Sequence, residues 1–212
     1  MELGQIVCDV ATCMKRVDSR GPQASNARTG EPYQPGIGPH TERQVVDYIV
    51  AELAVVNPDS YARKLHTSVP YPLARRQQCD LCIGQPGSWE WAIEIKMLRL
   101  MGDNGKPNDN MLMHILSPYP IHRSALTDCR KLLDSGLAGR KAIVVYGFDY
   151  PSLPMDLAVD AFEVLAGRQV RLGPRLSSSY SELVHPVHCA GRVFGWELNE
   201  SENQQGTPGG LR

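Results

Sequence analysis

One segment limits the possible fold more than any other part of the chain. Residues 141 to 148 read KAIVVYGF, a continuous apolar run that is rich in β-branched side chains. A strand with one solvated face alternates between apolar and polar residues, whereas a strand covered on both faces reads as such a run. We therefore predict that this segment is the central strand of a sheet.

The segments on either side of this strand complete an α/β pattern. Apolar residues at helical spacing predict helices at residues 2–18, from Thr41 to about 56, at 123–134 and at 155–166. Thr41 and Gln44 have the spacing of a capping box, which marks the start of the second helix. Strands are expected at 61–69, 77–83 and 91–100, with one or two more between 184 and 198. This order predicts an α/β protein with a mixed β-sheet flanked by helices.

The length of the chain indicates one domain. With 212 residues and a mass of 23.4 kDa, it can bury one sizeable core. We predict a single domain at residues 1–198 and a disordered tail at 199–212, where the sequence NESENQQGTPGGLR is polar and rich in glycine.

Composition indicates a cytoplasmic protein with no membrane segment. No apolar run approaches the roughly 20 residues that a membrane span needs, and the N-terminus lacks the basic-then-apolar order of a secretory signal. Six cysteines without such a signal are expected to be reduced thiols. Cys79 and Cys82 form a single CxxC, so a zinc or redox protein is an alternative, but a second ligand pair is missing.

Charge is distributed unevenly along the chain. The net charge of −1 argues against a strongly basic nucleic-acid binder. However, the segment between Ser60 and Cys79 contains no acid, and Arg130 and Lys131 belong to a second basic group. We expect these segments to form a basic surface if they converge in space. The side chains predicted to contact phosphates are Lys64, Arg75 and Arg76.

An acid and a base interrupt an otherwise apolar strand in residues 77 to 100, QQCDLCIGQPGSWEWAIEIKMLRL. Alternation along a strand places Glu94 and Lys96 on one face, beside Ala92 and Leu98. If the connecting loop runs from Gly84 to Glu90, a hairpin also sets Asp80 opposite Glu94. The predicted result is two carboxylates and an ammonium group on one surface of the sheet.

These side chains suit the hydrolysis of phosphodiesters. Carboxylate oxygens hold Mg²⁺ (or Mn²⁺), which usually keeps several waters and binds one or two protein carboxylates. We predict Asp80 and Glu94 as metal ligands, together with the backbone carbonyl of Ile95. Lys96 would orient or help to deprotonate the attacking water. Glu42 falls within the apolar stripe of its helix, so it is also a candidate for the site.

The pattern resembles the PD-(D/E)xK, or restriction-endonuclease-like, nuclease superfamily over residues 41 to 148. Cys79-Asp80 stands where that family usually has Pro-Asp, and Glu94-Ile95-Lys96 matches ExK. The resemblance implies an αβββαβ core and a metal-dependent nuclease that acts on nucleic acid, most often DNA. It also implies that Glu42 corresponds to an acid near the metal. A homodimer or a larger defence or repair complex would be consistent with it.

Two alternatives follow from the same residues. Glu94 and Lys96 could form a salt bridge on a solvated strand, with no role in chemistry. The chain could also be a catalytically silent nucleic-acid-binding or assembly subunit that keeps the fold and binds partners through basic patches and the loop at residues 20–40. Only a nuclease requires Asp80, Glu94 and Lys96 to converge.

Overall fold

The computed structural model describes residues 1–74, 76–108, 110 and 112–200. Arg75, one of the three predicted phosphate contacts, lies outside the described residues, as does the predicted tail from residue 201 onward.

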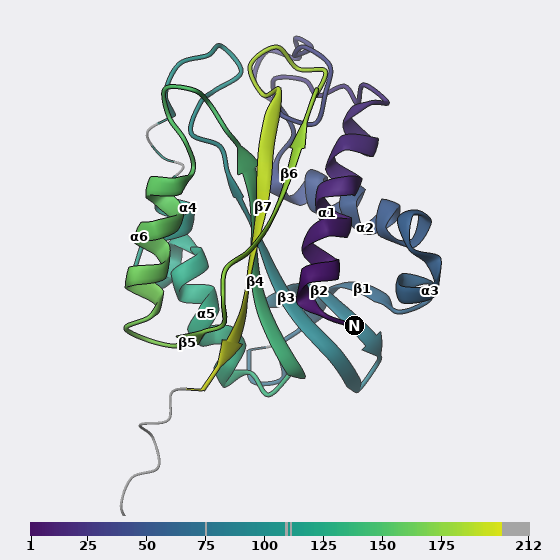
Figure 1. The fold of residues 1–212 in the computed structure, drawn as a ribbon, viewed down its shortest axis with the longest axis vertical. Coiled ribbons are helices and arrows are strands. Elements are labelled where there is room, and N and C mark those ends of the chain that lie inside the picture. The colour runs from purple at the N-terminus through teal and green to yellow at the C-terminus, as the bar shows by residue number, and fades with distance from the viewer. Residues whose placement is uncertain (75, 109, 111, 201–212) are drawn as a thin grey trace, which may run out of the picture.

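A mixed sheet of seven strands forms the centre of the molecule (Figure 1). The strands are β1 (Leu65–Pro70), β2 (Gln78–Gln85), β3 (Ser88–Leu98), β4 (Ala138–Phe148), β5 (Arg171–Leu172), β6 (Leu176–Ser181) and β7 (Ala190–Asn199). Their order is β1-β2-β3-β4-β7-β5, and β6 also pairs with β7. The β3–β4 pair is parallel and the other pairs are antiparallel.

Helices cover both faces of this sheet. In Figure 1, α1 (Leu3–Asp18), α2 (Glu42–Val56) and the short α3 (Pro58–Tyr61) lie on one side. The other side carries α4 (Met113–Leu116), α5 (Ala125–Asp134) and α6 (Asp156–Ala166), with a 3₁₀ turn at Pro120–His122. The prediction of an α/β protein with a mixed sheet flanked by helices is therefore confirmed.

The apolar run that predicted a central strand is β4. Its residues 142–148 are buried, and it lies between β3 and β7. Thr41 caps α2 as predicted. Its side-chain oxygen accepts a hydrogen bond from the Gln44 N–H, and the Gln44 side-chain oxygen accepts one from the Thr41 N–H. The strongest local signals in the sequence thus correspond to the observed elements.

Some predicted boundaries were wrong. The strand expected at 61–69 begins only at Leu65, because residues 58–61 form α3, whose first turn is capped by Asn57. The strand β6 lies before the interval 184–198, in a run of serines that gives little strand signal. It is a partly exposed strand that is packed against α1 and paired to β7.

The C-terminal end of the loop that follows α1 is held by a hydrogen bond to Asp18. Asp18 accepts hydrogen bonds from the Ile37 N–H at 2.8 Å and from the Val184 N–H at 2.5 Å. Ile37 and His40 are buried. Among the described residues, no helix is both long and apolar enough to cross a membrane.

Candidate active site

The β2–β3 hairpin sets the geometry of the site. Leu81 pairs with Ile93, and the same register continued by one residue brings Asp80 opposite Glu94, in agreement with the prediction. The connection is different from the predicted loop, because the strands continue to Gln85 and Ser88, leaving a tight turn of two residues.

A β-bulge reconciles this short turn with the predicted register. The pairing shifts by one residue between Ile83 and Gly84, so Glu90 is an extra residue on β3. Without this shift Asp80 would face Ile93, whose side chain lies on the other face of the sheet. Gly84 has φ +130°, and a Cβ there would lie 2.8 Å from the Glu90 nitrogen. The bulge therefore requires glycine at this position.

Two of the predicted acids bind backbone N–H groups of β3. Asp80 Oδ2 accepts from the Ile95 N–H at 2.9 Å, and Glu42 Oε2 accepts from the Met97 N–H at 2.7 Å. Side-chain carboxylates thus take the place of strand partners along this part of β3. Because the N–H and C=O of one strand residue point to the same neighbouring strand, the Ile95 carbonyl faces the same side as Asp80.

Lys96 and Lys131 bind carboxylates from three elements. Lys96 Nζ lies 2.9 Å from Asp128 and 3.6 Å from Glu42. Lys131 Nζ lies 2.9 Å from Glu94 and 2.6 Å from Asp128. We call this group the carboxylate cluster; it consists of Glu42, Asp80, Glu94 and Asp128 with the two lysines. Three of the four carboxylates therefore form ion pairs with the two ammonium groups, whereas Asp80 binds the Ile95 N–H. Among the described residues, no three carboxylates of the cluster have ligand atoms within 4.8 Å of one another.

The sequence did not identify Asp128, Lys131 or Tyr71 as members of the site. Asp128 lies three residues after Ala125 and four before Leu132, both of which are buried. The signal that selected Glu42 was an acid on the apolar stripe of a helix, and Asp128 shows the same signal in α5. The Tyr71 hydroxyl donates to Glu94, but nothing in the local sequence indicated that contact.

Burial and mutual repulsion raise the pKa values of two acids in the cluster. Glu94 is 1% exposed, and burial followed by the charges of Asp128 and Asp80 raises its pKa well above the usual range. The pKa of Glu42 is also raised, mainly by burial, while Lys96 and the Met97 N–H act in the opposite direction. A bound cation would relieve this repulsion.

The surrounding carboxylates keep Lys96 positively charged. Burial on its own would lower the pKa of this lysine, but Glu42, Asp128, Asp80 and Glu94 more than offset burial and raise the pKa. An ammonium group with a raised pKa is a poor base. The structure therefore favours a role for Lys96 as an orienting and charge-stabilising group over the predicted alternative of deprotonating water.

A pocket of about 730 Å³ opens beside the carboxylate cluster. Asp80 and Asp128 line it, and so do Tyr71 and Lys131. Five cationic side chains take part in the lining: Arg43, Arg76, Arg123, Arg130 and Lys131. The acids Asp80 and Asp128 are partly or fully buried, whereas all four arginines are exposed. The pocket is therefore acidic at its floor, while its rim carries four arginines and one acid, Asp134.

The predicted phosphate contacts are separated in the structure. Arg76 lines the pocket, in the segment between β1 and β2. Lys64 does not line it, since this residue precedes β1 and its carbonyl accepts from the Gly84 N–H near the opposite end of β2. The acid-free segment thus runs along β1, and only its C-terminal end, which carries Arg76, reaches the pocket.

The CxxC cysteines are buried beside the site. Both Cys79 and Cys82 are free thiols. The neighbouring Cys82 thiol and burial raise the pKa of Cys79 well above its usual value, which keeps it protonated. Among the described residues, neither cysteine belongs to a group of three or more side chains placed to hold a metal.

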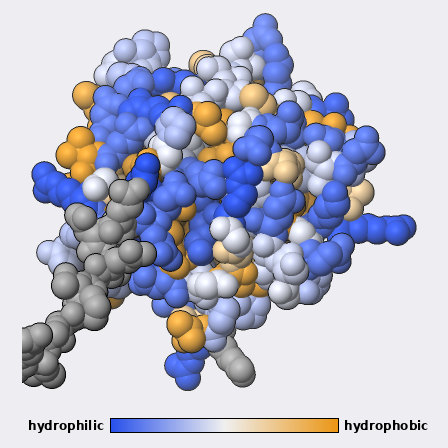
Figure 2. All heavy atoms as spheres, turned by 60° about the horizontal axis from the view of Figure 1, so that its bottom comes forward, coloured by the Kyte–Doolittle hydropathy of each residue, from blue (hydrophilic) through white to orange (hydrophobic). Residues whose placement is uncertain are grey.

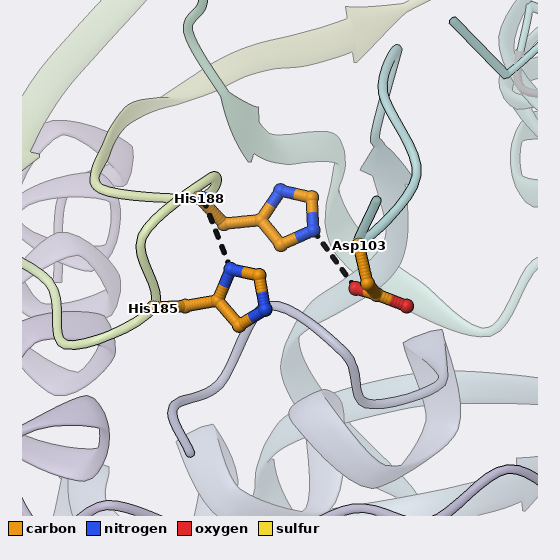
Figure 3. Close-up of side chains that lie close together, drawn as sticks. All are labelled: Asp103, His185 and His188. Atoms are coloured by element: carbon orange, nitrogen blue, oxygen red, sulfur yellow. Dashed lines mark hydrogen bonds and ion pairs between the residues drawn. The ribbon is translucent and has the colours of Figure 1, made fainter. Parts of the chain in front are cut away.

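A second group of side chains, Asp103, His185 and His188, has ligand atoms within 4.8 Å of one another (Figure 3). We call it the histidine cluster. His188 bonds to Asp103 at 2.9 Å through Nε2 and to the Tyr150 hydroxyl at 2.7 Å through Nδ1. His185 Nδ1 accepts from the N–H groups of Val187 at 3.2 Å and His188 at 3.3 Å.

These hydrogen bonds are unfavourable for metal binding at the histidine cluster. Because His185 Nδ1 accepts two N–H groups, the neutral ring carries its proton on Nε2. A metal bound at Nε2 would have to displace that proton, whereas ligating histidines normally donate a hydrogen bond through the other nitrogen. The cluster acts as a hydrogen-bonded link between the loop after β3 and the loop before β7.

Comparison with protein-family models, with curated proteins and with solved structures found no match.

Proposed function

We propose that this protein is a metal-dependent nuclease that hydrolyses phosphodiester bonds, most readily those of DNA. One observation carries the proposal: the carboxylate cluster, with more carboxylates than ammonium groups, borders a pocket that Asp80, Asp128 and four exposed arginines line. A floor with excess negative charge suits a divalent cation, and a rim of arginines suits the phosphates of a nucleic acid.

The donors in the cluster fit Mg²⁺ or Mn²⁺. Both ions prefer oxygen ligands, and Asp80, Glu94 and the Ile95 carbonyl would supply three of them. A bound ion would neutralise phosphate charge and make a water molecule more acidic. Burial and then the charges of Asp128 and Asp80 raise the pKa of Glu94, and a cation would offset the repulsion between these carboxylates.

The side chains around the metal ligands have separate roles in this mechanism. Lys96 remains charged, so it would donate to a phosphoryl oxygen or to the attacking water and stabilise the negative charge that develops there. Glu42 is a positioning residue, because it binds both the Lys96 ammonium and the Met97 N–H. Asp80 is held by the Ile95 N–H, which fixes the direction of its carboxylate.

Resemblance to the PD-(D/E)xK superfamily supports the same function. If the short helices α3 and α4 and the 3₁₀ turn are set aside, α2, β1 to β3, α5 and β4 occur in the αβββαβ order of that family. Asp80 and the ExK residues lie on the adjacent strands β2 and β3, as the family pattern requires.

Cleavage assays with isosteric variants test the proposal. Supercoiled plasmid, labelled single-stranded DNA and labelled RNA would be incubated with Mg²⁺, Mn²⁺ or EDTA. We expect metal-dependent cleavage of DNA that falls at least about a hundredfold in Asp80→Asn and Glu94→Gln, because each variant removes a charged metal ligand. Asp134→Asn is the matched control, since this exposed acid lines the same pocket outside the cluster.

The outcome also distinguishes the silent-subunit hypothesis. Lys131 and Tyr71 both bind Glu94, so this carboxylate has partners without a metal, which is the observation that favours a protein with no catalytic activity. Binding of DNA without cleavage of any substrate by the folded wild type would establish that alternative and reject the nuclease.

A further inference from the structure

We propose that the pocket beside Asp80 binds a single strand of DNA, with phosphates on its arginines and bases on the apolar side chains of its rim. This inference names the substrate class of the proposed nuclease site, and so rests on that function. It is carried by the arrangement of charge, shape and exposed apolar surface around the pocket.

Three arginines of the pocket are available to a ligand. Arg76, Arg123 and Arg130 are exposed, and within the described part of the chain none of them forms a salt bridge with a carboxylate. Arg43 is different, because it binds Asp47 and the Ser68 hydroxyl. Elsewhere in the molecule, arginines such as Arg192 are held by pairs of carboxylates. Within the described residues Arg28, Arg63 and Arg168 also form no salt bridge, so what distinguishes the pocket is that three such arginines line one cavity.

These arginines belong to two walls. Arg76 comes from the segment between β1 and β2, whereas Arg123 immediately precedes α5 and Arg130 lies within it. The buried acids lie below them. A backbone that passes between the walls can place one phosphate near Asp80 while its neighbours contact the arginines. The acidic floor would repel a phosphate beside Asp80 unless a cation were bound, whereas the phosphates on the arginines would bind without one.

Exposed apolar side chains accompany the arginines at the rim. Leu73, which lines the pocket, is 86% exposed, and Tyr119 and Ile121 are 64% and 84% exposed beside the lining residues Pro118 and Pro120. Single exposed apolar residues are ordinary on a protein surface, so their position matters more than their number. Unpaired bases stack on such side chains, whereas the bases of a duplex already stack on one another.

The face of the molecule at the lower end of the sheet in Figure 1 is shown in Figure 2. Hydrophilic side chains cover most of this view, and apolar ones stand singly or in small groups between them. The coloured part of this view thus lacks the broad apolar patch that is typical of a protein interface.

The depth of the site favours a single strand over a duplex. Glu94 and Lys96 are 1% and 7% exposed, so a scissile phosphate has to enter the pocket to approach them. The volume of about 730 Å³ lies in the range of pockets that enclose small molecules. A single strand can bend into such a pocket, whereas a rigid duplex would have to lose base pairs first.

Binding in EDTA tests this inference separately from cleavage. The probes are a short fluorescein-labelled DNA strand of mixed sequence and the duplex it forms with its complement, measured by fluorescence anisotropy at several salt concentrations. We expect the single strand to bind at least about tenfold more tightly than the duplex. The salt dependence should lose about 0.7 of its logarithmic slope in Arg123→Ala or Arg130→Ala, as expected for one phosphate contact with a single strand.

Matched variants separate the pocket from general charge and folding effects. Arg28→Ala removes an exposed arginine away from the pocket and should leave both affinity and slope unchanged. Tyr119→Ala should weaken binding roughly tenfold through lost stacking, while Tyr119→Phe keeps the ring and should not. Thermal unfolding checks that each variant is folded.

Each result has a definite meaning. Equal or tighter binding of the duplex, or pocket variants that behave like Arg28→Ala, would overturn the inference even if the protein cuts DNA. Single-strand binding through the pocket by a protein that cuts nothing would reject the nuclease and uphold the pocket as a DNA-binding site.

Discussion

The molecule contains two buried polar clusters that differ in charge and in access. The carboxylate cluster brings four acids to two lysines beside a pocket. In the histidine cluster, Asp103 binds His188 and lies 4.0 Å from Arg99, so one acid is balanced by one base. The histidine cluster thus has balanced charges, although His185 Nε2 is buried without a hydrogen-bond partner, whereas an acidic cluster open to a pocket has a use for a cation.

The largest expected effect on stability comes from removing the charge of Lys96 from the carboxylate cluster. Lys96→Met would leave Asp128 and Glu42 without this buried partner, so we expect the free energy of unfolding at neutral pH to fall by about 3–5 kcal/mol. Urea denaturation measures this change. Lys106→Met, at an exposed site, should change stability by less than about 0.5 kcal/mol. An equally small effect at Lys96 would mean that the cluster is solvated.

Divalent ions should stabilise the protein through the carboxylate cluster alone. At one hundred times its dissociation constant, Mg²⁺ or Mn²⁺ would add about 2.7 kcal/mol, or roughly 5 to 10 °C in Tm for a chain of this size. The effect should disappear in Glu94→Gln and persist in Asp103→Ala. Since the ligand must be ionised and the pKa of Glu94 is raised, the Tm increment should grow as pH rises above 4.5.

Scanning fluorimetry with Zn²⁺ tests whether the histidine cluster binds a metal. A zinc-dependent rise in Tm that is lost in His185→Asn would assign metal binding to the histidine cluster and contradict the tautomer argument.

A smaller loss is expected from disrupting the histidine cluster. Asp103→Ala removes the partner of His188 Nε2 and should lower the free energy of unfolding by about 1–3 kcal/mol. Asp103→Asn keeps an oxygen acceptor and should recover most of that loss. Cleavage of DNA should be unchanged in both variants once they are compared at equal folded fraction. Lost cleavage in a fully folded Asp103→Asn would show that the two clusters are coupled.

The smallest effect concerns pH, where the clusters should act in opposite directions. Burial lowers the pKa of His185, so the unfolded state binds its proton more readily and stability should decrease as pH falls through about 6.5. Glu94 has a raised pKa and should destabilise the fold as pH rises above 4.5. His185→Asn should reduce the acid slope by at most about 1.4 kcal/mol per pH unit.

Urea denaturation of wild type and His185→Asn across this pH range measures the difference. His40, whose pKa burial also lowers, should retain part of the slope in the variant. An unchanged slope in His185→Asn would indicate that His185 is not the titrating group.

The sequence predicted the parts of this structure that depend on short-range pattern. The strand β4, the cap of α2 and the alternation that places Glu94 beside Lys96 all follow from periodicity. The pairing of Asp80 with Glu94 was predicted from a loop between Gly84 and Glu90 that the structure does not have, and the bulge that restores this register was not predicted. Local periodicity sets the face of a strand, but it does not reveal a bulge.

Contacts between distant segments could not be obtained in this way. Lys131 reaches Glu94 only because α5 packs on β3, and Tyr71 reaches it from a loop before β2. The sequence placed Lys131 in a basic group but gave no reason to prefer it over Arg130. Lys64 shows the converse, since a residue within the acid-free segment is carried away from the pocket by the direction of β1.

The bulge at Gly84 has a consequence for how such a site can change. Four residues separate Gly84 from Asp80 on the same strand, which corresponds to roughly 13 Å. Even so, this glycine determines which face of the sheet Asp80 occupies. Substitution there would move the acid without altering any residue of the cluster. A substitution at this turn would therefore disturb the carboxylate cluster while all of its side chains are retained.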